Sequence, residues 1–327
     1  MNTKSKVLTL LEDNQGKYIS GEEIADALGL SRASVWKVIR ELQAGGHRIA
    51  AATNKGYMLE ASDDVLTAEG ILKNLARDSK LTKIICLDSV DSTNNYAKKI
   101  ALEGAAHGTL ITADVQTAGR GRHGHTFESP ANTGLYMTLI LRPKIEISKF
   151  QMITIADAVA VCLAIEELYE GARGKIFIKW VNDIYFEGKK ITGILTEAVT
   201  NFESGEIESV VTGIGINIAT KNFTSAAGDK AGSIFDDDGD RVFTRNKLCA
   251  RVADHIMNFA EDLNAPGLIA AYRERSLLTG KDITYMRDER KYSAHVEGID
   301  DLGGLIVLNE HNEREILRSG EVSLIRN

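Results

Sequence analysis

The hydrophobic pattern changes twice along the 327-residue chain, and the changes divide it into three regions. In roughly the first sixty residues, apolar side chains recur at helical spacing, as in Val7, Leu10 and Leu11. From about 65 to 275, segments with helical and with strand periodicity are mixed, and consecutive strands with tight turns indicate antiparallel pairing. After Gly280 only short strand-like runs remain. This pattern predicts an α+β multidomain protein with a central mixed or antiparallel sheet and a small C-terminal β-barrel.

The first region has the signals of three short helices and a hairpin. Ser20 and Glu23 have the spacing of a capping box, and Gly29 ends the helix that they begin. Ser31 can cap a third helix, and two short strands then flank the turn residues 53–56. Elements in this order are typical of a winged helix-turn-helix domain, which we place at residues 1–62.

The third predicted helix has a basic face. Between Ser31 and Met58, five basic residues stand against one acidic residue, a local charge of +4 in a chain of formal charge −7. This asymmetry favours contacts with DNA phosphates, although a basic, solvated helix on a protein-binding winged helix has the same pattern. The predicted DNA-binding residues belong to the helix-turn-helix Gly21–Arg40 and the wing: Arg32, Ala33, Trp36, Lys37, Arg40, Arg48 and Lys55.

A glycine-rich string at 119–124 is the most informative part of the middle region. It formally matches G-x-G-x-x-G, but loop residues follow it where a dinucleotide fingerprint needs a helix. Its glycines allow mobility, Arg120 and Arg122 carry positive charge, and no acidic residue lies from 115 to 127. The string predicts a mobile cationic loop for an anion such as a nucleotide phosphate. A merely basic surface loop, or one that touches DNA, remains an alternative.

Three further clusters have both a functional and an ordinary structural explanation. The cluster 91–94 either forms a polar floor on which a small ligand binds, or simply caps the start of a helix. The next cluster consists of residues 179–183 and Lys190. Lys190 either reaches a buried carboxylate or phosphate, or simply extends from a strand end to solvent. The alternating glycines in 213–217 leave a sheet face open to a flat ring, or mark a twisted core strand.

Several classes of protein are excluded or disfavoured. The sequence contains no H-E-x-x-H, G-x-S-x-G or Walker A motif, so a nucleophilic triad and a P-loop have no support. Cys86, Cys162 and Cys249 are far apart and lack C-x-x-C spacing, which argues against disulfides and zinc. The N-terminus lacks a signal-peptide pattern, and the most apolar stretch, 153–165, is too short to cross a bilayer. These features predict a cytoplasmic protein without membrane association.

Taken together and in this order, the clusters resemble the bifunctional biotin–protein ligase and biotin-operon repressor family over essentially the whole chain. The matching strings are Ser92–Asn94, Gly119–Gly124 with Ser129–Pro130, Lys179–Asp183, Lys190–Leu195, Gly213–Asn217 and Ser319–Ser323. The resemblance implies a class II synthetase-like ligase domain at 65–275 and an SH3-like barrel at 278–327.

The resemblance also implies a two-step reaction. The carboxylate of biotin attacks the α-phosphate of MgATP, which gives biotinyl-5′-AMP and pyrophosphate. A lysine of a biotin carboxyl carrier protein, the biotin-accepting part of a carboxylase such as acetyl-CoA carboxylase, then attacks this anhydride and AMP leaves. Without carrier, the retained adenylate would act as corepressor, promote a homodimer and license binding to operator DNA.

Site residues follow from the same resemblance. The implied biotin-binding residues are Ser92, Thr93, Asn94, Gln116, Arg120, Gly121, Arg122, Lys190 and Gly193. The implied nucleotide-binding residues are Arg122, Asn182, Asp183, Lys190 and Asn217, and the implied catalytic residues are Lys190, Arg120 and Arg122. No Mg²⁺ ligand is predicted.

The chain departs from the family pattern at three positions. Val181 replaces a usual proline, His125 an arginine and Phe127 a tryptophan. None of these affects Lys190 or the loop arginines, so we expect changes in rate and affinity rather than in function.

Three alternatives remain at this point. A ligand-sensing repressor with an inactive ligase domain is opposed by the retained Lys190 and loop arginines. A lipoate–protein ligase is opposed by the absence of that family's Arg-Arg-x-Ser-Gly-Gly-Gly string. A ligase that no longer binds DNA is opposed by Trp36, Lys37 and Arg40.

Overall fold

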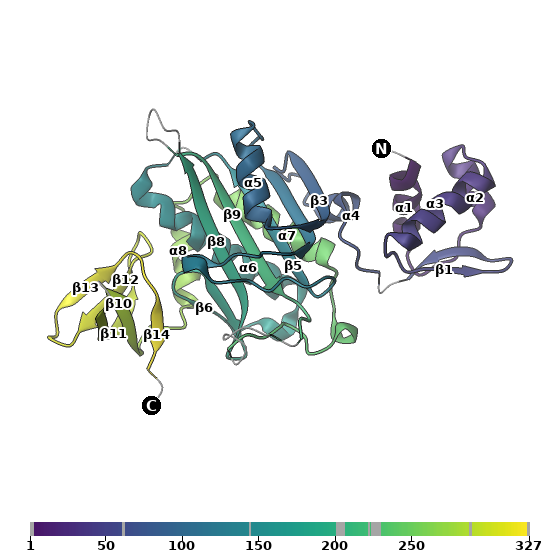
Figure 1. Cartoon of the computed structure of the whole chain (residues 1–327). Helices are drawn as coiled ribbons and strands as arrows, with labels where there is room; N and C mark the ends of the chain where they lie inside the picture. Colours follow the sequence, from purple (N-terminus) through teal and green to yellow (C-terminus); the bar gives the residue numbers. More distant parts are fainter. Residues whose placement is uncertain are drawn as a thin grey trace. The chain divides into compact units, whose positions relative to one another are not determined.

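The computed structural model describes residues 3–60, 63–143, 145–200, 207–221, 223, 230–287 and 290–325. They form two compact units, Met1–Leu75 with Thr244–Lys247, and Ala76–Phe243 with Leu248–Asn327 (Figure 1). The expected boundaries at 62/65 and 275/278 stay predictions, and residues 61–62 lie outside the described residues. No helix in the described ranges is both long and apolar enough to cross a membrane.

The first unit contains the predicted helices and hairpin. Its elements are α1 (Thr3–Asp13), α2 (Gly21–Leu28), α3 (Arg32–Ala44), β1 (Ile49–Ala52), β2 (Gly56–Leu59) and α4 (Ala68–Asn74). The predicted capping box is confirmed, since the Ser20 hydroxyl accepts from the Glu23 amide at 3.1 Å and the Glu23 carboxylate accepts from the Ser20 amide at 2.8 Å. Gly29 ends α2 in the left-handed conformation, as expected for a C-terminal cap.

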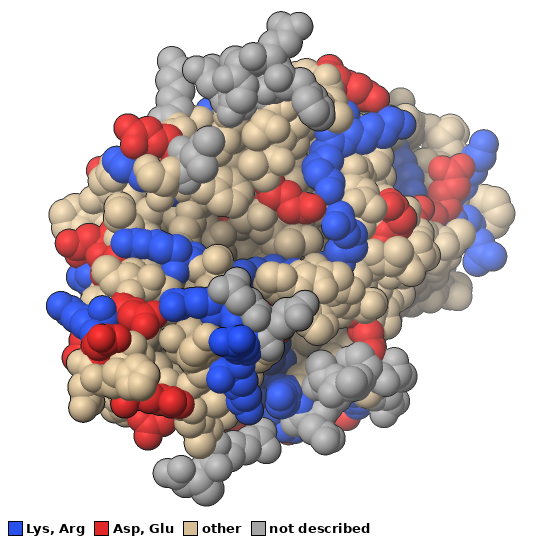
Figure 2. Space-filling view, turned by 60° about the vertical axis from the view of Figure 1, so that its left-hand side comes forward, with Lys and Arg blue, Asp and Glu red and all other residues tan. Residues whose placement is uncertain are grey.

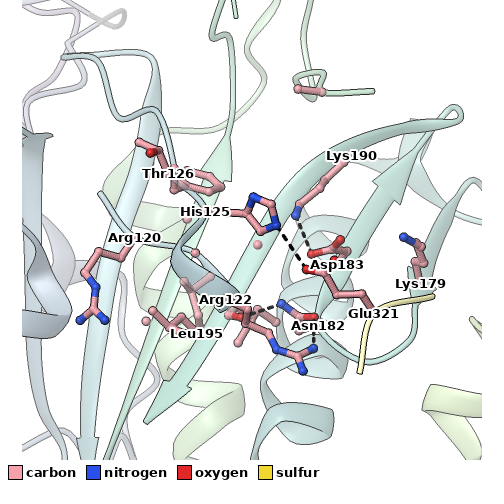
Figure 3. A pocket seen from close by; sticks show the side chains of 18 of the residues that line it. Arg120, Arg122, His125, Thr126, Lys179, Asn182, Asp183, Lys190, Leu195 and Glu321 are labelled. Carbon is pink, nitrogen blue, oxygen red and sulfur yellow. Dashed lines mark hydrogen bonds and ion pairs between the residues drawn. The ribbon is translucent and has the colours of Figure 1, made fainter. Parts of the chain in front are cut away.

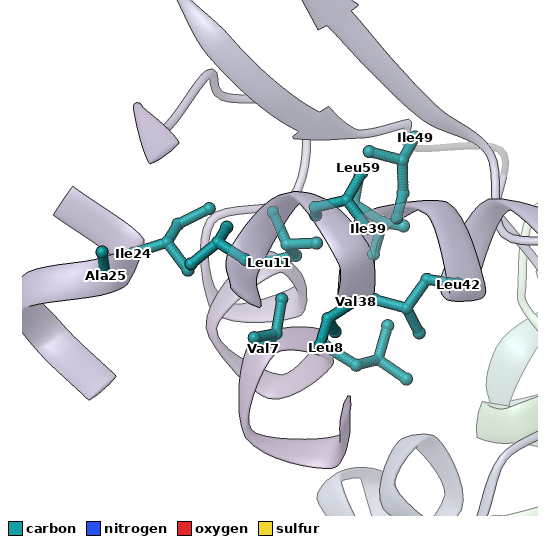
Figure 4. Packing of buried hydrophobic residues seen from close by; sticks show 11 residues of the cluster. Val7, Leu8, Leu11, Ile24, Ala25, Val38, Ile39, Leu42, Ile49 and Leu59 are labelled. Atoms are coloured by element: carbon teal, nitrogen blue, oxygen red, sulfur yellow. The ribbon is translucent and has the colours of Figure 1, made fainter. Parts of the chain in front are cut away.

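The core of this unit forms where the apolar faces of the helices meet the hairpin. Figure 4 shows Val7 and Leu11 of α1 packed with Ile39 and Leu42 of α3 and with Leu59 of β2. Burial of one face of α3 leaves the opposite, basic face in solvent, where Trp36 is 57% exposed. The fold therefore presents the side chains that we predict to contact DNA.

A seven-stranded mixed sheet forms the centre of the second unit, in the order β3-β4-β5-β9-β8-β7-β6. Its strands are β3 (Lys83–Val90), β4 (Thr109–Gln116), β5 (Gly134–Leu141), β6 (Ile176–Lys179), β7 (Asp183–Phe186), β8 (Lys189–Thr200) and β9 (Ile207–Asn217). Only the β3–β4 pair is parallel. The main helices of this unit are α5 (Thr93–Leu102), α6 (Phe150–Leu168), α7 (Arg245–Phe259) and α8 (Pro266–Glu274).

The register places α5 and α6 on opposite faces of the sheet. Thr138 of β5 lies opposite Gly213 of β9, and its hydroxyl contacts Asn94 of α5. The residue of β9 just before Gly213, Thr212, instead donates to Asp157 of α6. Because successive strand residues point to opposite faces, one face of the central strands carries α5 and the other carries α6.

Five strands form a separate C-terminal sheet in the order β13-β12-β11-β10-β14. They are β10 (Asp282–Arg287), β11 (Arg290–Ile299), β12 (Leu305–Asn309), β13 (Arg314–Leu317) and β14 (Val322–Leu324). The indole N–H of Trp180 donates to the carbonyl of Gly303 at 2.9 Å, which fastens this sheet to the end of β6.

Two strands were not predicted, β7 and β13. Each has four residues, too few to display a clear alternation, and the Asn182–Asp183 pair, at which β7 begins, has the composition of a turn. In the structure β6 ends at Lys179 and forms an antiparallel hairpin with β7.

A buried carboxyl lies beneath the sheet. Asp157 is 0% exposed, accepts hydrogen bonds from Thr196 and Thr212, and leaves its other oxygen without a partner among the described residues. Burial raises the pKa of Asp157 to about 7. The folded chain therefore keeps this proton between about pH 4 and 7, where the unfolded chain has lost it, so the group lowers stability as pH rises through that window.

We therefore expect Asp157→Asn to stabilise the fold at alkaline pH. At pH 8 the free energy of unfolding should rise by about 4 kcal/mol, and at pH 4 the two proteins should differ little. Urea unfolding at both pH values measures the difference. An equal stability change at the two pH values would contradict a buried, neutral Asp157.

Candidate active site

A cavity of about 560 Å³ opens on the α5 face of the sheet. Four parts of the second unit line it: the start of α5, the loop after β4, the strands β6–β9 with residues 230–231, and residues 320–323 at the start of β14. Figure 2 shows Lys and Arg side chains around a hollow on this side of the molecule. Segments far apart in the sequence thus meet at one site, and most of the predicted site residues lie there.

One end of the cavity is a buried polar floor. The amide and hydroxyl of Thr93 both donate to Oε1 of Gln116, at 2.9 and 3.0 Å, and Nε2 of Gln116 donates to Ser129 at 2.8 Å. Ser92 occupies the N-cap position of α5 but makes no side-chain capping bond. An ordinary cap therefore does not account for Ser92, and this polar floor can hold a small ligand with several donors and acceptors.

The two glycines of β9 leave room for side chains from other segments. A Cβ at Gly213 would lie 1.9 Å from Oδ1 of Asn94, and one at Gly215 would lie 2.4 Å from the ring of Phe127. The open sheet face predicted from the alternating glycines is therefore filled in this structure by Asn94 and by a ring of the chain itself, Phe127.

The other end of the cavity is cationic. Nζ of Lys190 lies 2.6 Å from Oδ1 of Asp183, and Nη1 of Arg122 donates to Oδ1 of Asn182 at 3.0 Å (Figure 3). Lys179 and Lys230 also line this end, and burial lowers the pKa of Lys179. Several cations near one point suit a polyphosphate.

Two predicted residues do not face this cationic end. Nη1 of Arg120 donates to Oδ1 of Asn95 at 3.0 Å, and Figure 3 shows its guanidinium directed away from Lys190. Asn217 does not line the cavity, because its side chain is buried and donates to the carbonyl of Gly232 at 3.1 Å. The other predicted site residues line the cavity, and so does Arg120: Ser92, Thr93, Asn94, Gln116, Gly121, Arg122, Asn182, Asp183, Lys190 and Gly193.

Sequence reasoning missed some lining residues. Lys230 lies beside the cavity because residues 230–232 pair with Lys190 at the start of β8. Glu321 reaches the loop from the C-terminal sheet, with Oε1 lying 3.3 Å from Nε2 of His125. No local pattern marks Lys230, whereas the C-terminal string of the family resemblance contains Glu321.

Comparison with known proteins agrees with this geometry. Residues 86–217 match the model of the Biotin/lipoate A/B protein ligase family, and residues 3–58 match that of an HTH domain. The bifunctional ligase/repressor BirA of Bacillus spizizenii is 37% identical over 241 residues, which cover 73% of this chain and 73% of that protein. The chain belongs to the BirA family of bifunctional ligase/repressors.

Other relatives match the chain over greater lengths. The BirA of Escherichia coli is 27% identical over 322 residues, 98% of this chain and 96% of that protein. A solved structure of biotin protein ligase from Aquifex aeolicus in complex with biotin and ATP is 27% identical, with a TM-score of 0.61. It covers 76% of this chain and 100% of its own. The predicted family and the helix-turn-helix are thereby confirmed.

Proposed function

We propose that this chain is an ATP-dependent biotin–protein ligase and a DNA-binding repressor of biotin genes. The ligase forms biotinyl-5′-AMP and transfers biotin to a lysine of a biotin carboxyl carrier protein. One observation carries the proposal: a single cavity joins a buried polar floor to a cationic end. This matches a substrate with a polar ring system at one end and a carboxylate at the other.

The cavity suggests how the two substrates divide the site. The ring system of biotin fits the floor formed by Ser92, Thr93, Asn94 and Gln116, with Gly193 and the loop residues 120–122 beside it. The carboxylate then points toward Lys190. ATP fits the side of Arg122, Asn182 and Asp183, with its α-phosphate near Lys190. The side chain of Asn217 bonds to the carbonyl of Gly232, which favours an indirect role for Asn217 in nucleotide binding. We assign no Mg²⁺ ligands.

Positioning and charge neutralisation dominate the first step, in which an anionic carboxylate approaches a polyphosphate. Lys190 exchanges its partner Asp183 for the two reacting anions and offsets their repulsion. The carboxylate oxygen bonds to the α-phosphorus and pyrophosphate leaves. In the second step a carrier amine attacks the acyl carbon, loses a proton and expels AMP, so no covalent enzyme intermediate is needed.

ATP–pyrophosphate exchange tests the ligase function, with biotin and lipoate as alternative acids. The matched family model covers both classes of ligase, so lipoate is the necessary control. We expect exchange with biotin alone. Exchange with neither acid, from folded protein, would favour the ligand-sensing repressor with an inactive ligase domain, and exchange with lipoate alone would overturn the substrate assignment.

Finer features of the fold and assembly belong to this proposal. We take the five-stranded C-terminal sheet as an SH3-like barrel, the central unit as class II synthetase-like, and the cytoplasm as the place of action. One winged helix covers one half-site, so specific operator binding calls for a homodimer that the adenylate promotes as corepressor.

Arg122→Ala is expected to leave the fold intact and to shorten retention of the adenylate. Arg122 is a fixed positive charge beside the expected phosphate position, and its guanidinium bonds to the neutral amide of Asn182. We expect release of biotinyl-5′-AMP to become about tenfold faster. Single-turnover formation followed by a chase measures release, and unchanged retention would contradict a phosphate contact.

Lys37→Gln is expected to weaken DNA binding without affecting adenylation. Lys37 is exposed on the basic face of α3. The logarithm of the binding constant for a mixed-sequence duplex falls linearly with the logarithm of the salt concentration. Losing one phosphate contact should make this slope shallower by about one unit. Lys6→Gln on α1 is the matched control, because Lys6 is an exposed lysine of the same unit. An unchanged slope would place α3 away from the DNA backbone.

A further inference from the structure

Glu197 lies on β8 just beyond the cavity. It follows Leu195, a lining residue, on the same face of the strand, because strand residues two apart share a face. Its side chain is 21% exposed, so the carboxylate is largely enclosed by its neighbours. The family strings that predicted the site stop before this residue, and none of them assigns it a role.

Three side chains from two other segments meet at this carboxylate. Nδ2 of Asn94 donates to Oε2 at 3.0 Å, and Nζ of Lys98 donates to Oε1, also at 3.0 Å. Nη1 of Arg120 lies 3.5 Å from Oε1. Burial opposes ionisation, but the hydrogen bonds and the two positive charges outweigh it and lower the pKa of Glu197. The group is therefore a carboxylate at neutral pH, able only to accept hydrogen bonds.

The carboxylate fixes the orientation of the Asn94 amide. Because Glu197 and the carbonyl of Leu195 both accept, the NH₂ group of Asn94 must face them. Oδ1 of Asn94 then points to Thr138 and to the space that Gly213 leaves open. The amide is thus held in one of its two possible orientations at the floor of the cavity.

The same carboxylate holds the cationic loop through Arg120. The guanidinium of Arg120 turns away from Lys190 (Figure 3). It bonds to Asn95 of α5 and forms an ion pair with Glu197. Arg120 lines the cavity, and its side chain is held by Asn95 and Glu197. The Arg120 contact therefore attaches the loop to the sheet, in addition to the contacts of Arg122 with Asn182 and of Phe127 with Gly215.

We propose that Glu197 is a positioning residue for ligand retention, which orients Asn94 and fastens the loop through Arg120. The proposal rests on the proposed function, because it assigns Asn94 and the loop to biotin and its adenylate. Glu197 touches neither the expected carboxylate nor the phosphates. Its loss should therefore weaken the hold on ligand and leave the chemical step nearly unchanged.

Glu197→Gln tests this, since the amide keeps the size and loses the charge. We expect the KM for biotin and the release rate of biotinyl-5′-AMP each to rise about tenfold, with kcat for exchange within twofold. Glu208→Gln on β9, whose partner Arg142 lies away from the cavity, is the matched control and should change neither quantity. Wild-type protein without biotin-dependent exchange would refute the proposed function itself, separately from the role of Glu197.

A double-mutant cycle with Arg120→Met distinguishes positioning from general destabilisation. If Glu197 acts through Arg120, its replacement in the Arg120→Met background should accelerate adenylate release less than in the wild-type background. Three results would each overturn the proposal. The two substitutions could accelerate adenylate release independently, so that their effects multiply. Glu197→Gln could lower kcat as much as it raises the KM for biotin, or it could release the adenylate at the wild-type rate.

Discussion

Lys190→Met is expected to lower biotin-dependent ATP–pyrophosphate exchange by about 10²- to 10³-fold, the range found when one electrostatic contact to a transition state is removed. Methionine keeps most of the aliphatic stem and removes the charge. In the proposed function Lys190 lies between the carboxylate and the α-phosphate, and its ammonium, 2.6 Å from Asp183 without substrates, turns to these anions when they bind. The loss should appear in kcat, because the charge matters most as the two anions react.

A matched control separates this effect from a change in overall charge. Lys175 is an exposed lysine of the same unit that pairs with Glu187 and does not line the cavity. Lys175→Gln should exchange pyrophosphate at the wild-type rate. If Lys190→Met retained more than a tenth of the wild-type kcat, Lys190 would not be the group that neutralises the reacting anions.

Features that depend on neighbours in the sequence are predicted well. The capping box of α2 needs only Ser20 and Glu23, three residues apart, and it forms as expected. The same holds for the amphipathic α3, whose buried face is set by helical spacing. The site residues at the start of α5 are likewise local, since they occupy consecutive positions.

Features that depend on distant partners are not predicted. The direction of Arg120 follows from Glu197, which lies 77 positions further along the chain. Glu321 joins the site only because the C-terminal sheet is fastened near Trp180. Lys230 is beside the cavity because residues 230–232 pair with the start of β8. Local patterns contain no information on such pairings, so the sequence indicates which segments form the site but not how their side chains pair.

Gly213→Ala is expected to abolish most biotin binding while the protein stays folded. The added methyl group would lie 1.9 Å from Oδ1 and 2.7 Å from Cγ of Asn94, far closer than atoms can approach. Gly213 lies in a central strand and its φ is not positive, so alanine suits the backbone and Asn94 must move. Asn94 then loses its bonds to Leu195, Glu197 and Thr138.

The expected loss follows because the displaced amide no longer meets biotin at the floor. The lost contact of Asn94 with biotin, and the polar group of biotin that it leaves unpaired, correspond to about 3 kcal/mol, which weakens biotin binding about 100-fold. Isothermal titration with biotin measures the affinity directly, without relying on turnover. Gly298→Ala on β11 is the control, because its Cβ would meet no atom within 4 Å. Biotin affinity within threefold of wild type in Gly213→Ala would mean that Asn94 contributes little to the floor, and the proposed orientation of biotin would have to be reversed.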